Sequence, residues 1–381
     1  MAVPIVVRGR FATPFSPIVG RISETTNEAE PAETVLVVKR GHSIPSEAAT
    51  FAAVLIEDEC SHLTGPRVGQ FESLDHLDEG DIVLIDGRDG RVRTVFRRSS
   101  PHNALFLTER CNNNCLMCSQ PPRDNDMLET CLRIVALLKR DAPTHLGITG
   151  GEPTLLGSAF VRLLESLRAE LPETSVTVLS NARTFADAQF VRSILHVGHP
   201  TLKFSIPLHA DVPDLHDYIA QSRGAFDETI AGFYNLESAG LESEVRVVLH
   251  ALNAPRLPSL AEYIYRKLPF VRNVAFMGLE VMGYVKKNWN VLWINPIDYS
   301  GELRNAVEHL YRRGMTVSIY NLPLCLLPNE LWSFSYRSIS DHKQTFIETC
   351  RPCRAKDHCT GFFSSGTKAY AASIHPLVSP P

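Results

Sequence analysis

Short apolar segments alternate with amphipathic segments from about residue 103 to residue 320, and this alternation constrains the fold more than any other feature. The segments typical of strands are HLGITG (145–150), SVTVLSNA (175–182), TLKFSIPLHA, EVRVVLHALN, NVAFMGLEVMGY and MTVSIYN. Helices are expected between them, in FVRLLESLRAEL, around 186–195, 226–239 and 259–267, and in GELRNAVEHLYRRG. This spacing predicts an α/β fold on a parallel sheet, open or closed into a barrel. Ligands then lie at the carboxyl ends of the strands.

Two further regions flank this alternation. Residues 1–100 hold β-rich runs, ETVLVV and FAAVLIE, and a hairpin candidate in GDIVLIDGRDGRVRTVFRR with its turn at 87–90. Residues 321–381 lose the periodicity and are rich in cysteine, serine and proline. We therefore expect a small N-terminal β domain (1–100), an α/β domain (101–320) and a cysteine-rich tail (321–381).

Composition excludes several classes of protein. The chain is 44% hydrophobic and 21% charged with a net charge of −4, so it carries no basic domain that would bind nucleic acid. No stretch reaches the 18 or so uninterrupted apolar residues of a membrane helix. The first residues, MAVPIVVRGRF, lack the pattern of a signal peptide. We expect a cytoplasmic protein, in which clustered cysteines bind metal or catalyse rather than form disulfides.

Seven of the nine cysteines fall into two groups, while Cys60 and Cys131 stand alone and are expected to be small buried hydrophobes. The first group is Cys111, Cys115 and Cys118, in CNNNCLMC. Three thiolates leave a four-ligand site incomplete, but a [4Fe–4S] cluster held by three keeps one iron open for a small molecule. Asparagine tolerates left-handed backbone, so residues 112–114 suit a loop around such a cluster.

A second motif follows the strand HLGIT, namely Gly150, Gly151, Glu152 and Pro153. By itself it reads as a turn before a helix. After Cys-x3-Cys-x2-Cys, however, it resembles the radical S-adenosylmethionine (SAM) superfamily. The resemblance implies a partial (β/α)6 TIM-like barrel and a catalytic [4Fe–4S] cluster on the three cysteines. It also implies that the GGEP segment holds the methionine amino group of S-adenosylmethionine, whose reductive cleavage yields a 5′-deoxyadenosyl radical.

The same resemblance implies roles for four other residues. Asn181 would lie near the cofactor, Ser205 would contact its ribose and Arg246 would reach its carboxylate. Met117 stands where an aromatic residue is commoner and can still pack on adenine. Each of the three strand-end residues could instead be an ordinary hydrogen-bonded polar group. His209 and His216 lie beyond a strand end and could contact the substrate, but they are read as ordinary loop histidines, and no catalytic residue is assigned.

The second group, in the tail, comprises Cys325, Cys350, Cys353 and Cys359. Four thiolates in a segment with little periodicity predict a metal that supplies folding energy. Spacing does not separate a zinc site from a second [4Fe–4S] cluster. The superfamily resemblance favours an auxiliary iron–sulfur cluster.

A closer resemblance rests on TERCNNNCLMCSQPP, GITGGEPTLLG, NLPLCLLP and the ending CTGFFSSG. These strings are similar to those of the radical maturases of the His-Xaa-Ser system. The resemblance implies a His-Xaa-Ser repeat precursor as the peptide substrate and an electron donor as a partner, and it leaves open whether a second maturase acts alongside. Two other classes stay open: a radical enzyme acting on a small molecule, and a non-catalytic iron–sulfur or zinc sensor or scaffold.

Overall fold

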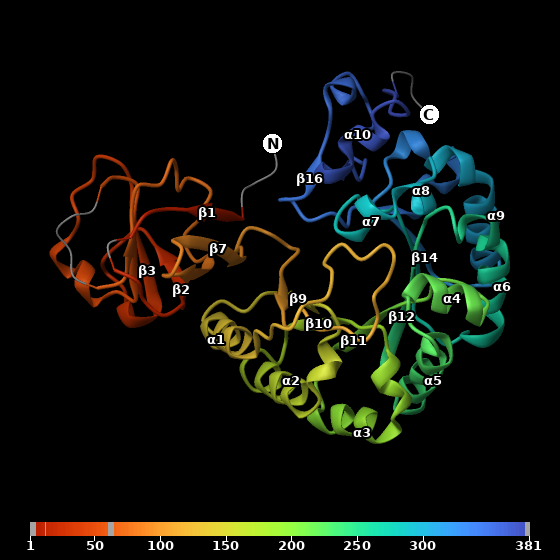
Figure 1. Cartoon of the computed structure of the whole chain (residues 1–381), viewed down its shortest axis with the longest axis horizontal. Helices are drawn as coiled ribbons and strands as arrows, with labels where there is room; N and C mark the ends of the chain where they lie inside the picture. The colour runs from red at the N-terminus through yellow and green to blue at the C-terminus, as the bar shows by residue number, and fades with distance from the viewer. Residues whose placement is uncertain (1–4, 12, 60–64, 378–381) are drawn as a thin grey trace.

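The structure, a computed structural model, describes residues 5–11, 13–59 and 65–377, so Cys60 lies outside the described residues. Seven N-terminal strands form one mixed sheet in the order β1-β7-β6-β2-β3-β4-β5 (Figure 1). Their bounds are β1 Val6–Arg8, β2 Ile18–Ser23, β3 Thr34–Val38, β4 Ala53–Ile56, β5 Arg67–Val68, β6 Ile82–Asp86 and β7 Arg91–Phe96. The predicted hairpin is present, since β6 and β7 pair antiparallel across residues 87–90.

The second sheet has eight strands in the order β15-β14-β13-β12-β11-β10-β9-β8, and every neighbouring pair is parallel. Its strands are β8 Ala104–Phe106, β9 His145–Thr149, β10 Ser175–Leu179, β11 Leu202–Pro207, β12 Glu242–Val248, β13 Val274–Met277, β14 Val317–Tyr320 and β15 Ser335–Tyr336. Because β8 and β15 are its two edges, the sheet is an open arc. The α/β partial barrel is therefore confirmed, and β15 extends the sheet into the segment expected to be a tail.

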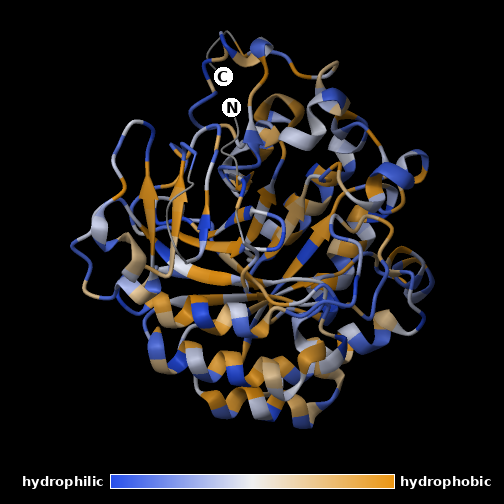
Figure 2. Cartoon of the chain, turned by 60° about the vertical axis from the view of Figure 1, so that its left-hand side comes forward, coloured by the Kyte–Doolittle hydropathy of each residue, from blue (hydrophilic) through white to orange (hydrophobic). Residues whose placement is uncertain are grey.

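Helices cover the outer side of this arc (Figure 1). They are α1 Leu128–Leu138, α2 Ser158–Glu170, α3 Ala188–Val197, α5 Ala225–Ser238, α6 Leu257–Lys267 and α9 Ser300–Tyr311. The helix α4 Pro213–Ala220 lies inside this ring, where its last carbonyls meet residues 114 and 116. In α2 the buried residues are Phe160, Leu163, Leu164 and Leu167, at the i, i+3, i+4, i+7 spacing of one helix face. Figure 2 shows that the strands of this sheet are largely apolar, whereas the helices carry both polar and apolar residues along their length.

Shorter elements lie beyond the carboxyl ends of the strands. They are α7 Tyr284–Lys287, α8 Trp289–Leu292, α10 Thr367–Tyr370 and the two-stranded sheet of β16 Gln344–Thr345 with β17 Phe362–Phe363. Figure 1 places them with the C-terminal segment, at one end of the arc. In the part of the chain that the structure describes, no helix combines the length and apolar character needed to cross a membrane.

Candidate active site

The first cysteine group lies in a long loop between β8 and α1. The base of this loop is closed by a bridge between Thr108 and Asp126 and by an ion pair of Arg110 with Asp126 at 2.7 Å. Farther along, the amides of Asn114 and Leu116 donate to the last carbonyls of α4, at 3.0 and 2.9 Å. The loop is therefore held at its base and along its middle, beside the carboxyl ends of the strands.

The three asparagines of CNNNC do not act through left-handed backbone, and that expectation is wrong. Positive φ among the described non-glycine residues occurs at Gln70, Ala182, Gln221 and Asn321. Asn112 and Asn113 instead accept hydrogen bonds from the end of β10 and the segment that follows it.

These hydrogen bonds come from Arg183 and Asn181. The Arg183 guanidinium donates to the Asn112 carbonyl at 2.6 Å and to Asn113 Oδ1 at 2.8 Å. The side-chain nitrogen of Asn181, Nδ2, donates to Asn112 Oδ1 at 2.6 Å and lies 3.9 Å from Cys111 Sγ. Asn181 thus lies beside the cysteine loop. Its proximity to a cofactor stays a prediction, and the role of Arg183 was not anticipated.

The three thiols of the loop are suited to a positively charged ligand. Burial raises the pKa of Cys111 to about 11 and that of Cys115 to about 12, and it also raises the pKa of Cys118. A metal bound by these sulfurs would hold them deprotonated despite their burial. The Cys111 sulfur already accepts the Asn113 amide at 3.4 Å, a bond that favours the thiolate. This donor set fits an iron–sulfur cluster.

The two glycines of GGEP are required by the cysteine loop itself. The Gly151 amide donates to the Thr108 carbonyl at 2.7 Å. A Cβ on Gly150 would lie 2.3 Å from the Thr108 carbonyl oxygen, and one on Gly151 would lie 2.2 Å from that of Arg110. Larger residues would push the loop away. The glycines were expected to let the backbone approach a ligand. In the structure they let the GGEP backbone approach the backbone at the start of the cysteine loop.

Glu152 is fully buried and accepts four hydrogen bonds within the protein. Its carboxylate receives the Thr154 amide at 3.2 Å, the Thr154 hydroxyl at 2.5 Å, the Ser180 hydroxyl at 2.8 Å and the Asn181 amide at 2.6 Å. Burial raises the pKa of Glu152, and these bonds oppose the shift. The carboxylate thereby ties the GGEP segment to the end of β10. Its direct contact with a methionine amino group stays a prediction.

The other GGEP residue, Pro153, begins a short 3-10 helix, Pro153–Leu156, and is buried. This start suits proline, whose missing N–H is not needed there. The turn before a helix that the motif predicts is therefore present.

Ser205 and Arg246 meet at a residue that the sequence analysis missed, Glu244. The Ser205 hydroxyl donates to Glu244 Oε1 at 2.5 Å, and Arg246 Nε donates to the same oxygen at 2.8 Å. Burial alone would raise the pKa of Glu244, but the Arg246 charge and these bonds outweigh burial and lower it. The period of two in ESEVRVV, which puts residues 244 and 246 on one side of β12, was the available signal. The ribose and carboxylate contacts of Ser205 and Arg246 stay predictions.

Met117 is buried in an apolar cluster with Ile219, Leu279, Val281, Val285 and Leu292. This packing seats the cysteine loop on α4, α7 and α8. Contact of Met117 with an adenine ring stays a prediction.

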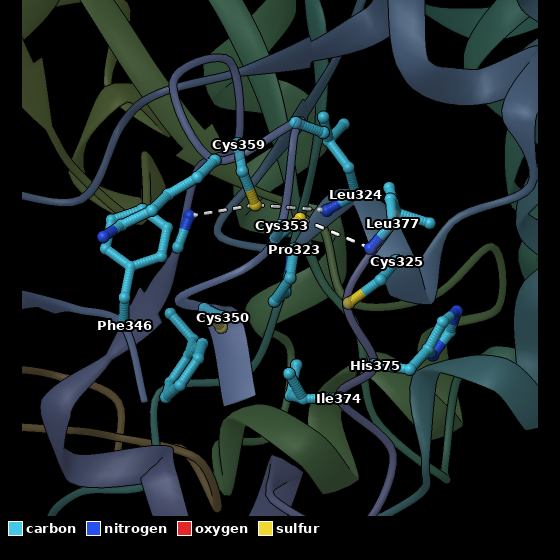
Figure 3. Close-up of a pocket in the computed structure, with 14 residues that line it drawn as sticks. Pro323, Leu324, Cys325, Phe346, Cys350, Cys353, Cys359, Ile374, His375 and Leu377 are labelled. Atoms are coloured by element: carbon cyan, nitrogen blue, oxygen red, sulfur yellow. Dashed lines mark hydrogen bonds between the residues drawn. The ribbon is translucent and has the colours of Figure 1, made fainter. Parts of the chain in front are cut away.

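The second cysteine group lines one pocket. Figure 3 shows Cys325, Cys350, Cys353 and Cys359 around it. The Cys359 sulfur accepts the amides of Leu324 and Gly361, both at 3.4 Å, and the Cys353 sulfur accepts the Leu377 amide at 3.5 Å. Burial raises the pKa of Cys325 to about 11. The four residues predicted to form one site are thus brought together from separate parts of the tail.

A strap of residues 283–293 links the two cysteine groups. The Tyr284 amide donates to the Cys118 carbonyl, and the Asn288 side chain donates to the Leu116 carbonyl, both at 2.8 Å. Trp289 and Trp293 are stacked with centroids 4.6 Å apart. Trp293 packs both on the apolar cluster around Met117 and on the cluster that contains Cys325 and Cys350. The strap was not predicted, because its two helices have four residues each and are too short to show a helical repeat of apolar residues in the sequence.

Residues 105–264, which run from β8 to α6 and include the first cysteine group and GGEP, match the sequence model of the radical SAM superfamily. Residues 105–264 therefore form a radical SAM domain. Members of this superfamily use a [4Fe–4S] cluster and S-adenosylmethionine. The match ends before the second cysteine group.

Individual relatives are distant. Fe-coproporphyrin III synthase of Methanosarcina barkeri is 23% identical over 222 residues, which are 54% of this chain and 50% of that protein. GTP 3′,8-cyclase of Petrotoga mobilis is 26% identical over 207 residues, 51% of this chain and 62% of that protein. The chain thus spans between half and two thirds of the length of these curated relatives. The solved structure of Streptococcus suis SuiB has a TM-score of 0.46 and 15% identity, covering 57% of this chain and 48% of that one.

Proposed function

We propose that this chain is a radical SAM enzyme that modifies a peptide or protein, with a His-Xaa-Ser repeat precursor as its substrate. The observation that carries the enzymatic part is the way the cysteine loop is seated. Arg183, Asn181 and the GGEP backbone fix it at the carboxyl ends of the strands, where parallel sheets bind their ligands. A sensor or scaffold would need the thiols but not this preorganised edge.

Cys111, Cys115 and Cys118 would hold a [4Fe–4S] cluster, leaving one iron for S-adenosylmethionine. When bound, this cluster supplies the electron that cleaves S-adenosylmethionine to the radical that takes a hydrogen atom from the substrate. The chain itself positions the reactants and excludes water. Buried Glu152 orders the GGEP segment, and the apolar packing of Met117 closes one side of the loop.

The second group would hold an auxiliary iron–sulfur cluster. Four thiolates at about 2.3 Å from one tetrahedral zinc would lie within roughly 4 Å of each other. Among the described residues, which include all seven grouped cysteines, no three His, Cys, Asp or Glu side chains are placed to hold a single ion. Thiolates that each bind a different iron lie farther apart, which suits the four cysteines around the pocket.

A small-molecule substrate is the second candidate, because two relatives are named for GTP and for coproporphyrin. Favouring a peptide are the resemblance to the His-Xaa-Ser maturases and the linkage of the auxiliary site to the cysteine loop through Trp293.

The test is anaerobic reconstitution with S-adenosylmethionine, a reductant and a His-Xaa-Ser precursor peptide, followed by mass spectrometry and chiral amino-acid analysis of the peptide. Loss of two hydrogens, or an epimerised residue at unchanged mass, supports the proposal. Formation of 5′-deoxyadenosine with an unaltered peptide would instead favour the small-molecule candidate.

A further inference from the structure

Three buried histidines form a group next to Cys115, two of them just past neighbouring strands and the third in a helix. His209 follows β11, His250 follows β12, and His216 lies in α4. Their exposed fractions are 3%, 0% and 1%, respectively. Burying an imidazole costs free energy unless its N–H finds an acceptor, so each ring requires an explanation.

The backbone of His209 is fixed from two sides. The Asn253 side chain donates to the His209 carbonyl at 3.2 Å, and the His209 amide donates to His216 Nδ1 at 3.2 Å. The rings of His209 and His216 lie 4.9 Å apart between centroids. The imidazole of His209 is therefore packed in one orientation rather than free to rotate toward solvent.

In this orientation His209 Nε2 faces the sulfur of Cys115, at 4.0 Å. Within the described part of the chain its other nitrogen, Nδ1, has no hydrogen-bond partner. A neutral imidazole carries a single N–H, on one of its two ring nitrogens. Only a proton on Nε2 gives that N–H an acceptor, and the acceptor is good only when the sulfur is a thiolate.

We infer that His209 is a positioning residue that donates Nε2–H to the Cys115 thiolate and thereby sets the reduction potential of the cluster on this loop. The inference rests on the proposed assignment of Cys115 as a cluster ligand. Hydrogen bonds to ligand sulfurs are among the factors that tune iron–sulfur potentials, because they stabilise the more negative, reduced state. His209 thus makes the cluster easier to reduce than burial alone would allow.

The experiment measures the midpoint potential of the reconstituted cluster by a redox titration monitored with electron paramagnetic resonance. His209→Leu removes the donor and should make reduction less favourable by on the order of tenfold in its equilibrium constant, equivalent to about 59 mV for one electron. His209→Gln keeps an N–H near the position of Nε2 and should stay close to wild type. His209→Phe replaces the leucine variant if that variant does not assemble a cluster.

His250→Leu is the matched control, because His250 is equally buried, neighbours His209 and has no polar contact with any cysteine that the structure describes. It should leave the potential unchanged. A wild-type potential in the apolar His209 variants, or an equal shift in the His250 variant, would overturn the inference. These outcomes differ from failure of the proposed function, in which the wild-type protein itself would show no reducible cluster.

Discussion

At the scale of single residues, the site is organised by side chains that face the protein rather than open space. The carboxylate of Glu152, the acidic residue of GGEP, accepts hydrogen bonds from the hydroxyls of Thr154 and Ser180 and from the backbone N–H of Asn181. The Arg183 guanidinium likewise faces the protein and donates hydrogen bonds to Asn112 and Asn113 of the cysteine loop. Glu152 and Arg183 are therefore part of the framework that holds the cysteine loop and the GGEP segment in place.

Glu152→Gln should lower the free energy of unfolding by about 1–3 kcal/mol, because an amide cannot accept all four hydrogen bonds. Binding of S-adenosylmethionine should weaken as well, with the cluster still assembled. Urea unfolding of the metal-free chain and equilibrium binding to the reconstituted protein measure the two effects. Glu165→Gln, on the exposed face of α2, is the control. If stability and affinity both match wild type, the role given to Glu152 is wrong.

His216 predicts an acid-sensitive fold. Burial lowers its pKa from 6.5 to about 4, so between these values the unfolded chain binds a proton that the folded chain does not. The free energy of unfolding should fall as pH drops through this window, by up to roughly 3 kcal/mol from this residue.

His216→Asn, which keeps an acceptor near the position of Nδ1, should flatten that dependence. The measurement is urea unfolding of the metal-free chain at pH 7 and pH 5. His42→Asn, at an exposed position, should leave the slope as it is. An equal slope in wild type and the His216 variant would contradict the assignment.

At the scale of elements, long periodic segments were predictable and short ones were not. The strands β9 to β14 and the helices α2, α3, α5, α6 and α9 match the predicted segments, because each has an apolar face of several residues. The four-residue helices α7 and α8 and the two-residue β15 carry too few residues for a period. The contacts of Arg183 depend on which loops meet in space, and a single sequence does not contain that information, whereas those of Glu244 had a signal in the period of two of β12.

Gly283 offers a test of the strap of residues 283–293. It has φ of +54°, and a Cβ there would lie 2.4 Å from the Cys118 carbonyl oxygen. Gly283→Ala should therefore lift the strap from the cysteine loop and reduce the iron retained per chain after reconstitution. Gly301→Ala, in α9 with no atom within 4 Å of the added Cβ, should retain wild-type iron. Equal iron in the two variants would show that the strap does not support the loop.

At the scale of the whole molecule, the barrel and the tail form a continuous assembly. The tail lies at one end of the open arc, next to α7 and α8 (Figure 1). Trp293 contacts the apolar clusters that adjoin both cysteine groups. The domain boundary expected after residue 320 does not coincide with the sheet, since β15 at Ser335–Tyr336 belongs to it.

The double variant Cys350→Ala/Cys353→Ala tests the tail. If both groups hold [4Fe–4S] clusters, the reconstituted wild type should contain about eight irons and the variant about four. The variant should still cleave S-adenosylmethionine without substrate but fail to modify the peptide. Zinc in the purified wild type, with about four irons, would reject the auxiliary cluster, and full peptide modification by the variant would reject a functional role for the tail.

The central claim is that the loop of Cys111, Cys115 and Cys118 is where S-adenosylmethionine is cleaved. The most direct measurement is the amount of 5′-deoxyadenosine formed anaerobically, with reductant, by the reconstituted wild type and by the variant with all three cysteines changed to alanine. The wild type should form 5′-deoxyadenosine, and the triple variant should form none above the protein-free background. Formation at the wild-type rate by the triple variant, or none by a wild type that holds its iron, would contradict the claim.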